Sequence, residues 1–163
     1  MGDIVLVNQV VAFNRSVGLT PADVVFQFAS LSFDMSVMDY FMALCHGAAL
    51  HLWREHAILW LDALLASNAT YLEITPSALA RADARILMGL RCVVSSGEPL
   101  PLSCGLLWSL QGALMLNPMG PSECTVHTTC GEISEGDSIA LIGKPMESMQ
   151  VYTLDPGLLP VPL

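Results

Sequence analysis

Short apolar blocks and blocks of helical spacing alternate along the chain and predict strands and helices in turn. The strand-like blocks hold three to five residues, mostly β-branched, aromatic or other apolar types, as buried strands do. They cover residues 24–28, 50–53, 71–74, 92–95 and 114–116. Helical spacing predicts helices over 36–46, 58–66 and 102–110, and Thr75-Pro76-Ser77 opens a further helix. Strands separated by single helices indicate parallel βαβ units, so we predict an α/β fold: a parallel sheet with flanking helices.

The composition predicts that this fold is only part of a larger unit. Apolar residues make up 53 % of the 163 residues and charged residues only 13 %, against about 25 % in ordinary soluble domains. Few charges are therefore available to cover a surface, and we expect residues 1–163 to form one partial domain, truncated at both ends. The net charge of −9, without any basic stripe, excludes nucleic-acid binding.

The location of the chain can be predicted from what its sequence lacks. The most apolar window, residues 41–52, is well short of the ~20 residues that a membrane span requires. The start of the chain has no signal-peptide pattern, and its five cysteines are irregularly spaced, as reduced core thiols are. We therefore expect a cytoplasmic protein without a membrane partner.

Polar residues follow three of the predicted strands, at the point where each strand ends. They lie in residues 32–36, in residues 95–98 and in the segment Asn117-Pro118-Met119-Gly120-Pro121-Ser122-Glu123-Cys124-Thr125. The carboxyl ends of parallel strands meet at one edge of a sheet, so these segments should line a single crevice. In the third segment, Ser122 and Thr125 offer hydroxyls to phosphate, Glu123 offers a hard oxygen to Mg²⁺, and Gly120 lets the backbone approach a flat ring.

Other candidate sites are disfavoured. His46, His51 and His56 fall on a predicted helix end, strand and loop, a spacing that does not bring three metal ligands together. Residues 120–124 nearly match the nucleophile elbow of serine hydrolases, but Cys124 replaces its last glycine and Thr125-Val126 predicts a strand where a helix is required. Most of the methionines at 35, 38 and 42 fit an ordinary core.

The 117–123 segment resembles the Asn-x-Tyr-Gly-Pro-Thr-Glu motif of the adenylate-forming (AMP-binding) enzymes, in the form found in nonribosomal peptide synthetase adenylation domains. Asn117, Gly120, Pro121 and Glu123 match, and Ser122 keeps the hydroxyl of the usual threonine. Met119 departs from the motif, because the family has a tyrosine there that stacks on adenine.

Further segments extend the resemblance in the same order and spacing along nearly the whole chain. Residues 28–37 are similar to the family's phenylalanine-aspartate segment, and residues 47–50 and 75–77 fit the same succession. Residues 96–100 resemble the Gly-Glu-(Ala or Pro)-Leu loop, and residues 142–145 the Ile-Gly-Arg-Pro turn. The resemblance implies part of the large N-terminal subdomain of an adenylate-forming enzyme.

The resemblance also implies an activity. Such enzymes activate an amino acid with Mg-ATP, giving an aminoacyl-adenylate and pyrophosphate, and pass it to the phosphopantetheine thiol of a carrier protein. Glu123 would coordinate Mg²⁺ and Ser122 would contact the phosphate. The residues implied at the nucleotide are Gly97, Glu98, Asn117, Met119, Gly120 and Ser122. The implied partners are the amino acid, ATP, the carrier protein and the rest of the synthetase.

Asp34 is implied to pair with the α-ammonium group of the substrate, since a buried cation needs a counter-charge. From the residues alone, Asp34 also fits an N-cap of the helix predicted from residue 36. The implied substrate pocket is mostly apolar, as binding pockets are. Its residues are Asp34, Met35, Met38, Glu73, Val94, Ser96, Pro118, Val126 and His127.

Glu73 is the informative member of that pocket. A carboxylate beside apolar walls suits a cationic or hydrogen-bonding side chain, such as that of ornithine or lysine. The alternative is a solvated glutamate at a strand end. His127 is equally compatible with a pocket wall, a titrating group and a histidine on an edge strand.

Several parts of the family's catalytic equipment are not found in these residues. Residues 1–18 hold no phosphate loop, and Lys144, the single lysine, belongs to a turn motif. The ribose-binding aspartate and the lid lysine would follow residue 163, so we expect neither adenylate formation nor pyrophosphate exchange by this chain alone. A non-catalytic remnant or interaction module is one alternative. The other is a ligase for aryl or fatty acids, against which Asp34 argues.

Overall fold

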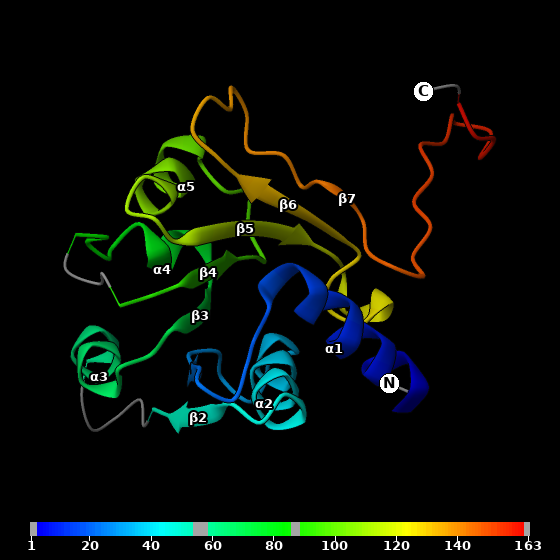
Figure 1. Cartoon of the computed structure of the whole chain (residues 1–163). Coiled ribbons are helices and arrows are strands. Elements are labelled where there is room, and N and C mark those ends of the chain that lie inside the picture. The colour runs from blue at the N-terminus through cyan, green and yellow to red at the C-terminus, as the bar shows by residue number, and fades with distance from the viewer. Residues whose placement is uncertain (1–2, 54–58, 86–88, 162–163) are drawn as a thin grey trace.

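The computed structural model describes residues 3–53, 59–85 and 89–161, and its centre is one seven-stranded sheet. The strands lie in the order β2-β1-β3-β4-β5-β6-β7 (Figure 1). Their bounds are Val24–Gln27 (β1), Ala49–Leu52 (β2), Tyr71–Ile74 (β3), Cys92–Ser95 (β4), Leu114–Met119 (β5), Thr129–Ile133 (β6) and Lys144–Pro145 (β7).

Helices cover both faces of this sheet (Figure 1). One face carries α1 (Asp3–Val17) and α2 (Met35–Cys45), and the other carries α3 (Trp60–Ser67), α4 (Pro76–Leu79) and α5 (Leu102–Ser109). Alternate strand residues enter the two cores: Phe26 and Leu72 face α3, whereas Val25 and Tyr71 lie on the side of α1 and α2. A sheet buried on both faces explains why its strands are continuous apolar runs in the sequence.

The predicted α/β fold with a sheet and flanking helices is confirmed, with one addition. Strands β1 to β5 are parallel, but β6 and β7 extend the sheet in antiparallel pairing. The antiparallel ladder pairs Asn117 with Gly131 and Met119 with Thr129. It therefore carries β5 to Met119, beyond the predicted end at residue 116, and makes the first residues of the motif part of a strand.

Helix α1 was not predicted by the sequence pattern. Val10 and Phe13 are buried on its inner side, but Ile4 and Val7 on the same helix are 86 % and 61 % exposed. Apolar residues on both sides of the helix remove the contrast by which an amphipathic helix is recognised.

The strand order places an edge of the sheet where ligands bind in α/β proteins. From β1 the chain passes to β2 on one side, and β3 then pairs with β1 on its other side, so the order reverses between β1 and β3. The carboxyl ends of β1, β3, β4 and β5 share the edge at which such a reversal opens a crevice. Within the described ranges, no helix combines the length and apolar character needed to cross a bilayer.

The Ile-Gly-Lys-Pro turn depends on Gly143. Its φ is +71°, and a Cβ added there would lie 1.9 Å from the Cys130 carbonyl oxygen, in the backbone of β6. We predict that Gly143→Ala lowers the free energy of unfolding by about 2 kcal/mol or more in urea titrations. Gly112→Ala is the matched control, since Gly112 has φ +86° but nothing within 4 Å, and should lose about 1 kcal/mol. Equal losses would contradict the close packing of the turn on β6.

Candidate functional site

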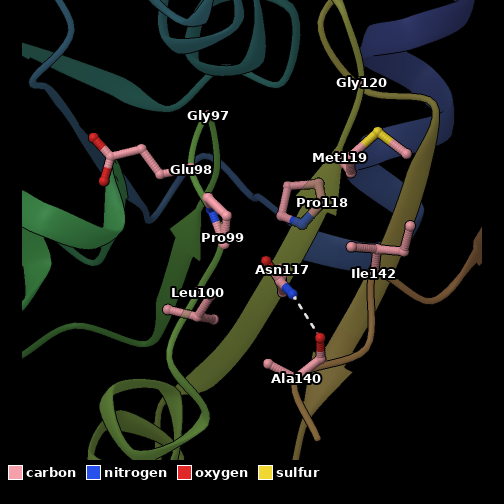
Figure 2. Close-up of a pocket in the computed structure, with 10 residues that line it drawn as sticks. All are labelled: Gly97, Glu98, Pro99, Leu100, Asn117, Pro118, Met119, Gly120, Ala140 and Ile142. Carbon is pink, nitrogen blue, oxygen red and sulfur yellow. Dashed lines mark hydrogen bonds between the residues drawn. The ribbon is translucent and has the colours of Figure 1, made fainter.

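A cavity of about 430 Å³ opens at the carboxyl ends of β4 and β5 (Figure 2). One wall is the loop after β4, another is the end of β5, and Ala140 and Ile142 from the segment before β7 close the third side. Of the residues expected at the nucleotide, five line this cavity: Gly97, Glu98, Asn117, Met119 and Gly120. Ser122 does not line it. Their contact with a nucleotide stays a prediction, but segments about 20 residues apart in the sequence do meet at one opening.

Four lining residues were not predicted as site residues from the sequence: Pro99, Leu100, Ala140 and Ile142. Pro99 and Leu100 belong to the motif loop 96–100, Ala140 lies just before the turn 142–145, and Ile142 is the first residue of that turn. The Asn117 amide holds this segment in place, since its Nδ2 donates to the carbonyl oxygens of Ala140 at 3.4 Å and Leu141 at 3.1 Å (Figure 2).

Glu98 lines the cavity with the aliphatic part of its side chain and not with its carboxylate. Its carboxylate points away toward α4 (Figure 2), where it accepts hydrogen bonds from the Ser77 backbone N–H at 3.0 Å and the Ser77 hydroxyl at 2.9 Å. The carboxylate thus satisfies free donors at the start of α4.

The loop after β5 is tighter than the sequence suggested. A Cβ on Gly120 would lie 2.5 Å from the Val126 carbonyl oxygen and 2.7 Å from the Thr128 nitrogen. The backbone of residues 126–128 passes so close to residue 120 that only glycine fits there. Thr125 and Val126 have φ of +65° and +69°, and the strand predicted there is wrong, because β6 begins only at Thr129. Thr125 is also buried, and a contact of its hydroxyl with phosphate stays a prediction.

Asp34 lies at the N-cap position of α2, but its side chain makes no capping hydrogen bond. The N-cap alternative is therefore wrong. The Asp34 carboxylate instead accepts a hydrogen bond at 2.5 Å from the hydroxyl of Ser122, in the 3₁₀ turn η1 (Ser122–Cys124). The structure brings together the two residues expected to contact the substrate ammonium and the phosphate. In the described part of the chain, Ser122 opens a 3₁₀ turn and no α-helix follows it, so the nucleophile elbow stays excluded.

Glu123, the next residue in η1, is exposed. Among the described residues, no three His, Cys, Asp or Glu side chains gather as a metal site. One accessible carboxylate fits Mg²⁺ nevertheless, because this ion commonly takes one or two protein oxygens and completes its shell with water and phosphate.

Glu73 is fully buried at the centre of a polar cluster. Its carboxylate accepts hydrogen bonds from Tyr71 Oη at 3.2 Å, Ser96 Oγ at 3.0 Å and His127 Nε2 at 2.9 Å. A solvated Glu73 is therefore wrong, and so is an edge-strand His127, since that ring is buried before β6 and packs against Phe13. The cluster joins β3, β4 and the loop after η1.

Asp39 adds a second buried acid that the sequence did not reveal. It lies on α2 and is fully buried, and burial together with the charge of Glu73 raises its pKa well above 3.8. The N–H groups of Phe28 and Ala29 approach and oppose this rise in pKa. Neither Asp39 oxygen has a hydrogen bond of normal geometry among the described residues. The Nδ1 atom of His127 also lacks a partner there.

The remaining residues of the implied substrate pocket lie in the cavity and in one of the two cores. Pro118 lines the cavity, and Met35 is half-buried at the start of α2. Met38, Val94 and Val126 are buried together in the core on the side of α1 and α2. Their role toward a substrate stays a prediction.

The other described histidines, His46 and His51, make contacts within the fold. His46 Nδ1 lies 2.9 Å from the Met42 carbonyl oxygen, and the His51 ring stacks on Phe26 with centroids 5.5 Å apart. His56 lies outside the described residues.

The sequence profile of the AMP-binding enzymes matches residues 5–163. The chain belongs to the AMP-binding enzyme family. It is 38 % identical over 154 residues to chondramide synthase cmdD of Chondromyces crocatus, covering 89 % of this chain and 4 % of that protein. It is 35 % identical over 161 residues to bacitracin synthase 3 of Bacillus licheniformis, covering 96 % of this chain and 2 % of that protein.

The fold agrees with this assignment. The crystal structure of the nonribosomal peptide synthetase FmoA3 bound to α-methyl-L-serine-AMP superposes with a TM-score of 0.82 at 26 % identity, over 96 % of this chain and 20 % of that one. The AMP-binding chain described here is thus related to nonribosomal peptide synthetase adenylation domains and has the fold of their large N-terminal subdomain. It spans only a few per cent of the length of its curated relatives.

The buried acid of this AMP-binding chain should make its stability depend on pH. The pKa of Asp39 is higher in the folded chain than the ordinary 3.8, so folding favours the protonated acid. Its contribution to stability is present below pH 3.8 and is lost as the pH rises through the raised pKa. We predict that Asp39→Asn, which stays neutral, gains stability relative to the native chain as the pH rises.

Urea unfolding at a series of pH values measures this difference. Asp62→Asn, on the exposed side of α3, controls for the loss of a surface carboxylate. A difference in unfolding free energy between the native chain and Asp39→Asn that stays constant with pH would contradict the buried-acid assignment.

Proposed function

We propose that the chain is the central part of an amino-acid-activating adenylation domain of a nonribosomal peptide synthetase. The reaction joins an amino acid carboxylate to the α-phosphate of ATP, releasing pyrophosphate, and the aminoacyl group then passes to the phosphopantetheine thiol of a carrier protein. One observation carries the proposal. Asp34 meets Ser122, in the loop after β5, beside a cavity lined by Asn117 and by Gly97 from the loop after β4. FmoA3, a similar protein, has been crystallised with an amino acid joined to AMP, which supports this chemistry.

In this proposal the chain positions its ligands and balances their charges. Gly97, Asn117, Met119 and Gly120 border the purine, and Ser122 donates to a phosphate oxygen. Asp34 pairs with the α-ammonium group. Glu123 would hold Mg²⁺, whose charge offsets that of the phosphates when it is bound.

The buried cluster supports a cationic amino acid such as ornithine or lysine. Asp39 and Glu73 are both fully buried, and His127 is their one basic neighbour in the cluster. Two ionised acids beside this one histidine would leave at least one negative charge without a partner. The raised pKa of Asp39 indicates that a proton supplies that partner in the ligand-free chain. A substrate ammonium group would serve the same purpose.

The alternatives have less support. A ligase for aryl or fatty acids would have no ammonium group for Asp34. A non-catalytic remnant would keep the fold but lose nucleotide binding, and Met119 is the residue that favours it. Nucleotide affinity therefore separates a working site from a remnant.

We predict that the chain binds AMP at the cavity and that Met119→Tyr binds it more tightly, by about fivefold. An aromatic ring stacked on a base contributes about 1 kcal/mol more than aliphatic contact does. Titration of AMP, followed through the NMR signals of the Ile142 methyl groups, measures both affinities. Leu158→Tyr, on an exposed residue outside the cavity, is the control. No AMP binding by either the native chain or Met119→Tyr would support the remnant and contradict the proposal.

We also predict that the chain binds L-ornithine or L-lysine more tightly than L-leucine or L-phenylalanine. Glu73→Gln should reduce that preference by about tenfold, because a charged hydrogen-bond partner is lost. Calorimetric titration of the four amino acids measures this ratio, with the exposed Glu132→Gln as the control. A native preference for the large apolar amino acids would contradict a cationic substrate.

A further inference from the structure

Two groups with separate proposed duties are hydrogen-bonded to each other in the ligand-free chain. The Ser122 hydroxyl donates to Asp34 Oδ2 at 2.5 Å, a charge-assisted contact between residues 88 positions apart in the sequence. Within the described ranges, this is the one side-chain hydrogen bond recorded for either residue. Ser122 begins η1 and Asp34 immediately precedes α2. The contact therefore connects the loop after β5 to the start of that helix.

The contact cannot persist unchanged when both ligands are bound. A serine hydroxyl has a single proton to donate, so Ser122 cannot donate fully to Asp34 and to a phosphate at the same time. A phosphate that accepts the hydrogen bond from Ser122 also brings negative charge near the Asp34 carboxylate. The carboxylate has then lost its hydrogen-bond donor. An ammonium group on Asp34 removes both difficulties, because it replaces the lost donor and neutralises the carboxylate.

We propose that the Ser122–Asp34 hydrogen bond couples the two subsites, so that a bound amino acid raises the affinity for a nucleotide phosphate. The ligand that binds first breaks the contact, and the second binds to groups already released. Linkage requires the effect to be mutual, so the phosphate raises the affinity for the amino acid by the same factor. This coupling rests on the proposed function, since it assumes that Asp34 takes the ammonium and Ser122 the phosphate.

The size of the coupling follows from the hydrogen bond that is exchanged. A hydrogen bond to a charged group at a partly exposed site corresponds to a factor of about ten in affinity. The coupling is specific to ligands that carry a phosphate, because a nucleoside has no phosphate oxygen to accept a hydrogen bond from Ser122. AMP and adenosine, which share the base and ribose, are therefore a matched pair of probes.

The test measures the dissociation constants of AMP and of adenosine on the whole chain, each without and with saturating L-ornithine, and again with glycine. We expect one or both amino acids to tighten AMP about tenfold and to change adenosine less than about twofold. In Ser122→Ala the tightening of AMP should fall to about twofold or less. Ser134→Ala removes another serine hydroxyl near a carboxylate, that of Glu132 at 3.4 Å, and should keep the native coupling.

The outcomes separate the coupling from the proposed function. If AMP and an amino acid both bind but their affinities are independent, the coupling is overturned and the adenylation assignment stands. Tightening that survives in Ser122→Ala, or that is equal for adenosine, also overturns the coupling. If neither AMP nor either amino acid binds, the proposed function fails and the coupling fails with it.

Discussion

The geometry of this site depends on the buried carboxylate of Glu73. It accepts hydrogen bonds from Tyr71 on its own strand, from Ser96 at the end of β4 and from His127 in the loop after η1. A buried charge is tolerated only when such partners satisfy it, and removing one partner of a buried pair commonly costs about 3–5 kcal/mol. The chain turns sharply between Gly120 and His127, which places Ser122 beside Asp34 and leaves Glu123 exposed.

We propose that the same buried region links stability to ligand binding. Asp39 and Glu73 lie close enough for the charge of one to raise the pKa of the other. A protein that needed only a stable core would be served as well by apolar residues in these positions. We therefore propose that the two buried acids beside one histidine serve recognition, with a substrate cation taking the place of a proton.

The sequence was sufficient for those parts of the fold that are set by local pattern. The strands β3 and β4 have the predicted bounds, because strands buried on both faces form short, mostly apolar runs in the sequence. Residues that depend on distant contacts were not predicted. Antiparallel pairing with β6 lengthens β5, the tight crossing at Gly120 puts Thr125 and Val126 in the left-handed region, and apolar residues on both sides conceal α1.

The candidate site divides in the same way. The resemblance of the motifs identified Asp34, Gly97, Asn117 and Ser122, which the structure places around one edge of the sheet. Asp39 was missed because an isolated acid on a helix ordinarily faces solvent. Ile142 was missed because its position in the cavity depends on a distant contact. Asn117, more than 20 residues earlier in the chain, binds the backbone of Leu141, and Gly143 packs on β6.

The central claim is that one crevice receives both a purine and an amino acid ammonium group. A non-hydrolysable sulfamoyl analogue of ornithyl-adenylate joins the two in a single molecule. Backbone amide NMR spectra recorded during its titration would test the claim most directly. We expect the signals of Gly97, Asn117, Met119 and Asp34 to shift together, with one dissociation constant. Shifts confined to the opposite edge of the sheet, or absent from Asp34 while the purine residues respond, would contradict a shared crevice.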